Sequence, residues 1–327
     1  MTTRGAQRLL IAYDGSPSAA TAVRAAASLF PGAHASIATV PSDPTVNAST
    51  AVAMLPGMSP TAVQQTVEQL EDESRREAGE TAERAVQQAR TLGLDAEAVT
   101  IAPSAPAWAT LLDAAHRLDA DVLICGTRGR GAFARALLGS TSSSLLHHTD
   151  LPLLVVPDGG GALDGPAVLA YDGSDGARRT VDVVGHLLGG RATVVVHGWE
   201  PTYYRGLSAP AVAAGGIDAP VEIVVQLHQA LVDRAAATTE EGVAAARAAG
   251  LDAVGDTVES DNGIWRGVLA AARAHGASVI ATGSRGLGRA RSVLVGSVSS
   301  GLVQNAELPV LVVPAHPATD EPAEHHG

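Results

Sequence analysis

The chain has 327 residues, of which 46% are apolar and 17% are charged, enough apolar material for about two globular cores. Its formal net charge of −12 argues against nucleic acid as a partner, since neutralising phosphates requires a basic face. All 22 basic residues are Arg, which excludes a phosphate-loop lysine, a Schiff-base lysine and a lysine general base.

Cysteine content and hydropathy indicate the compartment. The one cysteine, Cys125, cannot form an intrachain disulfide and is expected to be a small buried residue. The N-terminal apolar stretch is too short for a signal peptide, and no apolar run approaches membrane-spanning length. We therefore expect a cytoplasmic protein with no membrane partner.

The predicted elements occur twice, offset by 157 or 158 residues. Segments 9–16, 35–40, 122–126 and 151–157 carry short apolar runs typical of buried strands, and 167–174, 193–198, 279–283 and 308–314 match them in order. Helical patterns lie between these strands, and they include one long helix in each half, which ends at the matching segments 91–99 and 248–256. Each half thus predicts right-handed βαβ crossovers and a parallel sheet with helices on both faces.

The repeat predicts two domains, 1–157 and 165–315, joined by a glycine-rich linker at 158–164 and followed by a disordered tail at 316–327. Segments 41–62 and 199–220 are longer than the minimal pattern requires. Segments of this length often form lids or binding loops, and an excursion without a role is the equal alternative.

A glycine signature follows the fourth strand of each half. Gly126, Gly129, Gly139 and Ser140 have the same spacing as Gly283, Gly286, Gly296 and Ser297. Glycine permits close approach of the backbone to a ligand and positive φ, and the helix that then begins points its free N–H groups at the strand ends. Ser140, Thr141 and Ser142 add hydroxyl donors. The pattern predicts a phosphate cradle.

The two glycine loops are also basic. They contain six arginines and no Asp or Glu, an unusual density in an acidic chain. The alternative is that these arginines are solvated surface charges. The arginines are Arg128, Arg130, Arg135, Arg285, Arg289 and Arg291.

Asp14 and Asp172 each follow the first strand of their half, in the context Ala-Tyr-Asp-Gly-Ser. A carboxylate at this position can accept a hydrogen bond from a ribose hydroxyl or an adenine amine. The competing interpretation is a helix N-cap. Because Ser16 and Ser174 can serve as caps, we favour ligand binding for the two aspartates.

The paired signatures, the strand-ending aspartates and the closing strands LPLLVVP and LPVLVVP resemble the universal stress proteins, in the tandem form common among actinobacteria. The resemblance covers about 8–157 and 165–314. It implies an adenine-nucleotide-binding (HUP-like) α/β fold with five parallel strands in the order 3-2-1-4-5 in each domain. It also implies the ATP-binding subgroup.

The resemblance further assigns roles by position. Asp14 would contact adenine or ribose, the backbone of Val40 would contact the adenine edge, and the glycine signature would wrap ribose and phosphates, with Mg²⁺ bridging the phosphates. Because Gly198 stands where the first half has Val40, the second site is expected to have a thinner apolar wall. The expected nucleotide-binding residues are Ala12, Asp14, Val40, Gly126, Arg128, Gly129, Gly139, Ser140, Thr141 and Ser142, then Ala170, Asp172, Gly198, Gly283, Arg285, Gly286, Gly296, Ser297, Val298 and Ser299.

Three functions remain open from the sequence. The first is an ATP-binding stress-response and signalling module with one site per domain and a protein partner of unknown identity. The second is a slow ATPase or an adenylate-forming enzyme, against which the glycine loops lack a carboxylate or histidine to orient water. The third is a scaffold without nucleotide. The resemblance also implies that the closing strands pair within the chain as a pseudo-dimer, with a homodimer as a further option.

Overall fold

The structure is a computed structural model that describes residues 7–41, 60–102, 105–127, 138–159, 163–201, 221–284 and 295–315. The chain divides into two compact units, Met1–Gly160 and Gly161–Gly327, called domain 1 and domain 2 below. Each is described by itself. The predicted tail and most of the two long segments, 42–59 and 202–220, lie outside the described residues.

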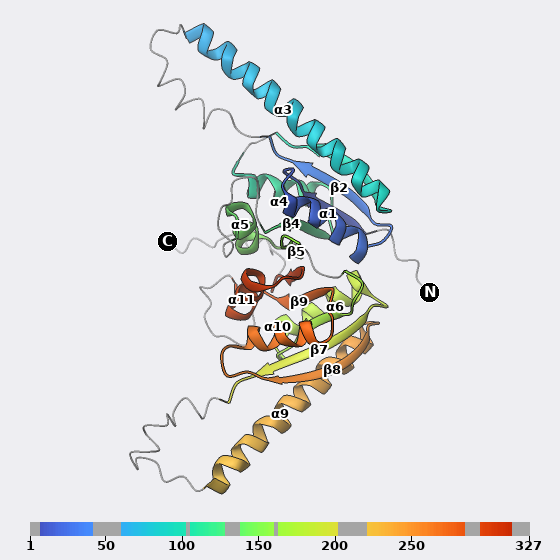
Figure 1. Cartoon of the computed structure of the whole chain (residues 1–327), viewed down its shortest axis with the longest axis vertical. Coiled ribbons are helices and arrows are strands. Elements are labelled where there is room, and N and C mark those ends of the chain that lie inside the picture. Colours follow the sequence, from blue (N-terminus) through green and yellow to red (C-terminus); the bar gives the residue numbers. More distant parts are fainter. Residues whose placement is uncertain are drawn as a thin grey trace, which may run out of the picture. The chain divides into compact units, whose positions relative to one another are not determined.

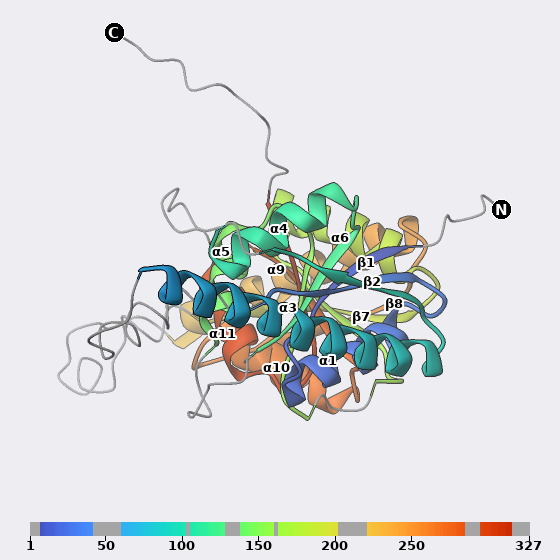
Figure 2. The ribbon, with the colours of Figure 1, turned by 90° about the horizontal axis from the view of Figure 1, so that it is seen from above.

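The described residues of domain 1 form a parallel sheet of five strands in the order β3-β2-β1-β4-β5, as the resemblance implied. Helices α4 and α5 cover one face and α1 and α3 cover the other (Figure 2). The strands are β1 (Arg8–Ala12), β2 (His34–Thr39), β3 (Asp95–Thr100), β4 (Val122–Gly126) and β5 (Leu153–Val156). The helices are α1 (Pro17–Leu29), α3 (Pro60–Thr91), α4 (Ala107–Arg117) and α5 (Ser140–His148).

Domain 2 repeats this arrangement with the order β8-β7-β6-β9-β10. Its strands are β6 (Ala167–Ala170), β7 (Ala192–Trp199), β8 (Asp252–Glu259), β9 (Val279–Gly283) and β10 (Val310–Val313). Its helices are α6 (Asp175–Leu188), α9 (Val221–Ala248), α10 (Ile264–Ala274) and α11 (Ser297–Asn305). The predicted alternation of strands and helices is confirmed in both halves.

Apart from the exposed Arg8 that begins β1, the two central strands of domain 1, β1 and β4, are apolar, because helices cover both of their faces. Leu9, Leu10 and Ile11 of β1 are at most 1% exposed, and Val122, Leu123 and Ile124 of β4 are fully buried. Cys125 is buried in β4, as predicted, and burial raises the pKa of its thiol to about 12.

The long helices α3 and α9 pack on their sheets through only part of their length (Figure 1). In α3, the buried positions begin at Ala78 and continue through Ala82, Ala85 and Ala89, small residues that let the helix lie close to the strands. The preceding turns are mainly exposed, with Leu70 at 43%. These turns follow the segment that lies outside the described residues.

Candidate functional site

Those predicted site residues of domain 1 that the structure describes gather at the carboxyl ends of β1, β2 and β4. Strand β1 lies between the other two, with Ala12 opposite Ala38 of β2 and Ile11 opposite Ile124 of β4. The amide of Tyr13 donates to the Ala38 carbonyl oxygen at 2.8 Å, which continues this pairing toward Asp14. The chain order reverses between β1 and β4, the position at which open parallel sheets bind ligands.

The same convergence occurs in domain 2. Ala170, at the end of β6, lies opposite Val196 of β7, and β6 lies beside β9, which ends at Gly283. Gly198 lies two residues beyond Val196 and is still within β7. The fold therefore brings the described part of each predicted set to one edge of one sheet.

Asp14 and Asp172 each begin a tight turn of the same kind. The Ser16 amide donates to Asp14 Oδ1 at 2.9 Å, and the Ser174 amide donates to Asp172 Oδ1 at 3.0 Å. The glycine between each pair has a φ of 80° in domain 1 and 76° in domain 2, which makes Gly15 and Gly173 the natural residues there. The turn fixes the direction of each carboxylate.

The serines are the helix caps. Ser16 Oγ accepts from the Ala19 amide at 3.2 Å at the start of α1, and Ser174 Oγ accepts from the Ala177 amide at 3.1 Å at the start of α6. The prediction that Ser16 and Ser174 cap their helices is thus confirmed. A ligand role for the aspartates stays a prediction.

The helix after each glycine loop begins at a glycine N-cap. The Gly139 amide donates to the Thr127 carbonyl oxygen at 2.7 Å, and the Ser143 amide donates back to the Gly139 carbonyl oxygen at 2.9 Å to start α5. Gly296 makes the corresponding bonds, of 2.7 Å to Ser284 and 2.9 Å from Ser300, at α11. Neither helix receives a capping hydrogen bond from a side chain of the described residues.

The uncapped first turns leave backbone donors at the strand ends. In α5 these are the amides of Ser140, Thr141 and Ser142, and in α11 those of Ser297, Val298 and Ser299. Such amides, with the positive end of the helix dipole, favour an anion. Ser140 and Ser297 are exposed, whereas Thr141 and Val298 are half-buried.

The Ser142 hydroxyl has a different role from the one expected. Ser142 Oγ donates to the carbonyl oxygens of Thr127 and Gly139 at 2.9 and 3.1 Å, and Ser299 Oγ donates to that of Gly283 at 2.6 Å. Both side chains are buried. These hydroxyls hold the helix start against the end of the strand, so only their backbone amides face the predicted phosphate.

Gly126 is explained by packing. A Cβ built on it would lie 2.6 Å from Ser18 Oγ, 2.8 Å from Ser18 Cβ and 2.9 Å from the Ser18 carbonyl carbon. It is absent from the glycines with positive φ, so the expectation of a left-handed backbone there is wrong. The residue is glycine because α1 crosses the end of β4 at this distance.

The wall of the second site is not thinner at Gly198, contrary to expectation. A Cβ at Gly198 would come within 2.7 Å of Ile264 Cγ2, so this methyl of α10 already fills the space of the missing side chain. The residue that matches Ile264 in domain 1 is Ala107. Domain 1 therefore has a large residue after the strand, Val40, and a small one on the helix, Ala107. Domain 2 has the reverse, with Gly198 on the strand and Ile264 on the helix.

Sequence reasoning missed Thr127, the residue that follows Gly126. Its Oγ1 is buried and has no hydrogen-bond partner in the described part of the chain, beside the first turn of α5. The matching Ser284 Oγ accepts from the Ala315 amide at 3.0 Å. A buried hydroxyl without a partner is costly unless a further group bonds it. The signal in the sequence was a hydroxyl residue after the first glycine in both halves.

Four predicted binding residues, Arg128, Gly129, Arg285 and Gly286, lie outside the described residues, as do the other arginines of the loops. Trp108 and Trp265 contact helices. The Trp108 ring stacks on His148 with centroids 4.5 Å apart, and Trp265 lies so close to Gly301 that a Cβ there would be 2.5 Å from its ring. Each tryptophan therefore packs against the helix that follows the glycine loop of its own domain.

A hollow of about 430 Å³ lies elsewhere in domain 2, between α9 and the edge strand β8. Its lining includes Thr239, Val243 and Thr257, and the Thr239 and Thr257 hydroxyls are 2.8 Å apart. It contains none of the predicted site residues. In the ranges that the structure describes, every helix is too short or too polar to cross a bilayer.

Comparison with known proteins agrees with this architecture. The model of the universal stress protein family matches residues 5–157 and again 166–314. A universal stress protein of Mycolicibacterium smegmatis is 30% identical over 214 residues, which span 62% of this chain and 64% of that relative. One of Mycobacterium tuberculosis is 28% identical over 212 residues, 63% of this chain and 68% of the relative.

Among solved structures, a universal stress protein of Archaeoglobus fulgidus matches with a TM-score of 0.59 at 18% identity. The match covers 94% of this chain and 98% of that chain, and at this identity it shows the fold alone. Two matches of one family model, each over one parallel sheet with its helices, establish the ancestry of both halves. The chain belongs to the universal stress protein family and consists of two tandem domains of that family.

Proposed function

We propose that each domain binds one ATP, with the adenosine between the ends of its first two strands and the phosphates on the first turn of the helix that follows the glycine loop. The chain would then act as a nucleotide-dependent stress-response module in the cytoplasm, recognised by a protein partner in its loaded state. Bound Mg²⁺ would shield the phosphate charges.

The carrying observation is the start of α5. An uncapped turn of backbone amides stands beside the buried Thr127 hydroxyl, which has no partner among the described residues. An anionic group with several oxygens satisfies both kinds of donor at once. The arginines in the sequence of the glycine loops carry a charge opposite to that of phosphate. The Asp14 carboxylate, which the turn holds, is a suitable acceptor for a ribose hydroxyl.

The proposal is for binding rather than efficient hydrolysis. The glycine loops, 127–138 and 284–295, contain no Asp, Glu or His that could orient a water molecule toward a phosphate. The pairing of the closing strands stays a prediction alongside it.

The test is nucleotide stoichiometry in six versions of the full chain: the parent, two single Glu variants, the double Glu variant and two Gln controls. Gly139→Glu places a carboxylate at the first turn of α5, and Gly296→Glu does the same at α11, where a like charge repels the phosphates. Both glycines have φ and ψ that any residue adopts, −63° and 159° for Gly139 and −71° and 160° for Gly296. Gly139→Gln and Gly296→Gln are the matched uncharged controls.

We expect two ATP molecules per chain by isothermal titration calorimetry, one in either Glu variant and none in the double variant. The Gln controls are expected to keep two sites with reduced affinity. Mass spectrometry of the supernatant from denatured protein identifies what was bound. Unchanged stoichiometry in the Glu variants would refute the site, and release of ADP or AMP alone would favour hydrolysis.

A further inference from the structure

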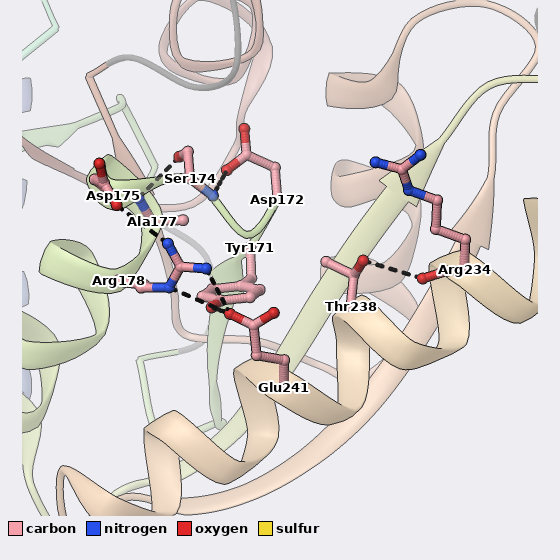
Figure 3. A network of polar contacts seen from close by, with 9 residues as sticks. All are labelled: Tyr171, Asp172, Ser174, Asp175, Ala177, Arg178, Arg234, Thr238 and Glu241. Atoms are coloured by element: carbon pink, nitrogen blue, oxygen red, sulfur yellow. Dashed lines mark hydrogen bonds and ion pairs between the residues drawn. The ribbon is translucent and has the colours of Figure 1, made fainter.

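Domain 2 contains a polar network that ties the end of β6 to two helices (Figure 3). The Tyr171 hydroxyl donates to Glu241 Oε1 at 2.7 Å, and Arg178 Nη2 donates to the same oxygen at 2.9 Å. Tyr171 directly follows β6, Arg178 belongs to α6, and Glu241 belongs to α9. One carboxylate oxygen therefore holds three elements together.

The backbone and the side chain of Tyr171 are both held in place. Its amide donates to the Val196 carbonyl oxygen at 2.9 Å, and its own carbonyl oxygen accepts from His197 Nδ1 at 2.8 Å. Its ring lies against α9 at Gly242, where a Cβ would come within 2.7 Å of Cδ1. Tyr171 as a whole residue is 2% exposed. Since Tyr171 precedes Asp172, its position sets where the Asp172 turn begins.

The charge states suit this arrangement. Burial, together with the bond to Glu241, raises the pKa of Tyr171 to about 12, so its hydroxyl keeps the proton that it donates. The bonds from Tyr171 and Arg178 lower the pKa of Glu241, which therefore stays an acceptor. Arg178 also pairs with Asp175, at 3.1 Å, in the first turn of α6.

Domain 1 has none of these partners. The positions that match Arg178, His197, Glu241 and Gly242 hold Ala20, Thr39, Arg84 and Ala85. These four residues are thus specific to domain 2, although both domains carry the same Tyr-Asp-Gly-Ser sequence.

We infer that Glu241 is a positioning residue for the nucleotide site of domain 2: through Tyr171 it anchors the Asp172 turn to α9, so that occupancy of the site and the stability of α9 are coupled. The inference rests on the proposed function for its ligand. By reciprocity, a nucleotide bonded to Asp172 stabilises α9 to the extent that α9 strengthens its binding.

The first measurement needs no ligand. The quantity measured is the hydrogen-exchange rate of the Ser174 amide, which donates to the Asp172 carboxylate. It is compared in the full-length parent protein, in Tyr171→Phe and in Glu241→Ala. Loss of the Tyr171 hydrogen bond to this half-exposed carboxylate of Glu241 is expected to speed the exchange roughly tenfold in Tyr171→Phe. Glu241→Ala, which also loses the bonds from Arg178, is expected to speed it at least as much. Glu241→Gln, which retains an acceptor, is expected to lie between. The control Glu240→Gln removes the same charge from the next residue and should change nothing.

The second measurement is ATP affinity of one domain at a time. In the Gly139→Glu background, where domain 2 alone binds, Tyr171→Phe is expected to weaken binding roughly tenfold. In the Gly296→Glu background, where domain 1 alone binds, it should leave affinity unchanged. Saturating ATP should slow exchange in α9 of the parent protein and not in the Tyr171→Phe variant.

The outcomes separate the two proposals. Unchanged Ser174 exchange in Tyr171→Phe and Glu241→Ala overturns the anchor, whatever the protein binds. Faster exchange with unchanged domain 2 affinity overturns the positioning role. A parent protein that binds no nucleotide refutes the proposed function, and the coupling to ligand with it, while the exchange measurement still decides whether Glu241 anchors the turn.

Discussion

The close approach of α1 to the end of β4 predicts what a single methyl group at Gly126 will do. In Gly126→Ala, the new Cβ would meet Ser18 Cβ at 2.8 Å and the Ser18 carbonyl carbon at 2.9 Å. Ordinary carbon contacts are about 3.5–4.0 Å, so α1 or β4 must move by roughly 0.6 Å or more. The Ser18 hydroxyl can rotate away, but the backbone of the helix cannot.

Overpacking of this kind costs about 1–3 kcal/mol, offset in part by about 0.4–1 kcal/mol from the lower chain entropy of the unfolded alanine variant. A net loss of about 1–2 kcal/mol lowers the Tm of a domain of this size by roughly 2–8 °C. Differential scanning calorimetry of the full chain measures it, with the transition of domain 2 as the internal standard.

Two further variants decide whether the contact is the cause. Ser18→Gly removes two of the three contacting atoms and should restore part of the lost stability in the double variant, because the contact with the Ser18 carbonyl carbon remains. Gly79→Ala is the control, because Gly79 lies within α3 and a Cβ there meets nothing within 4 Å. Alanine at that position should stabilise by about 0.5–1 kcal/mol. A Gly126→Ala protein as stable as its parent would refute the packing explanation and return Gly126 to ligand contact.

Three other predictions follow from single contacts. Gly198→Val should lower the free energy of unfolding of domain 2 by about 1–3 kcal/mol in urea, because the Ile264 side chain fills the space that the valine would need. Adding Ile264→Ala should recover most of this loss. No recovery would contradict the proposed exchange of a large and a small residue between strand and helix. The hydrogen bond that His34 donates to Asp95 is the largest cause that raises the pKa of His34, so this pair should stabilise domain 1 fully below about pH 6.5 and less as the pH rises through the folded-state value. Asp95→Asn should flatten that dependence, and an identical pH profile would count against the pair. The Cys125 thiol, with a pKa of about 12 through burial, should react with a thiol reagent only on unfolding, so rapid labelling of the native protein would disprove its burial.

Several features of this protein were determined by the sequence alone, because local chemistry is sufficient for them. The duplicated pattern of apolar runs predicted two parallel α/β domains, since the alternation of strand and helix leaves few other topologies. Ser16 and Ser174 were recognisable as caps because a cap bonds an amide only three residues away. The helix at 140–148 was predictable from the glycine and serines that begin it.

Tertiary structure decided the roles of residues whose partners are distant in sequence. Gly126 contacts Ser18, Gly198 contacts Ile264, and Tyr171 bonds Glu241, 70 residues away. No periodicity or motif encodes such pairs, because each depends on how closely a helix crosses a strand. The halves share one backbone plan, so the sequence predicted one site in each half, with a thinner apolar wall at Gly198 as the expected difference. Packing made them different, with an unpartnered Thr127 hydroxyl among the described residues of domain 1 and a Glu241 anchor in domain 2.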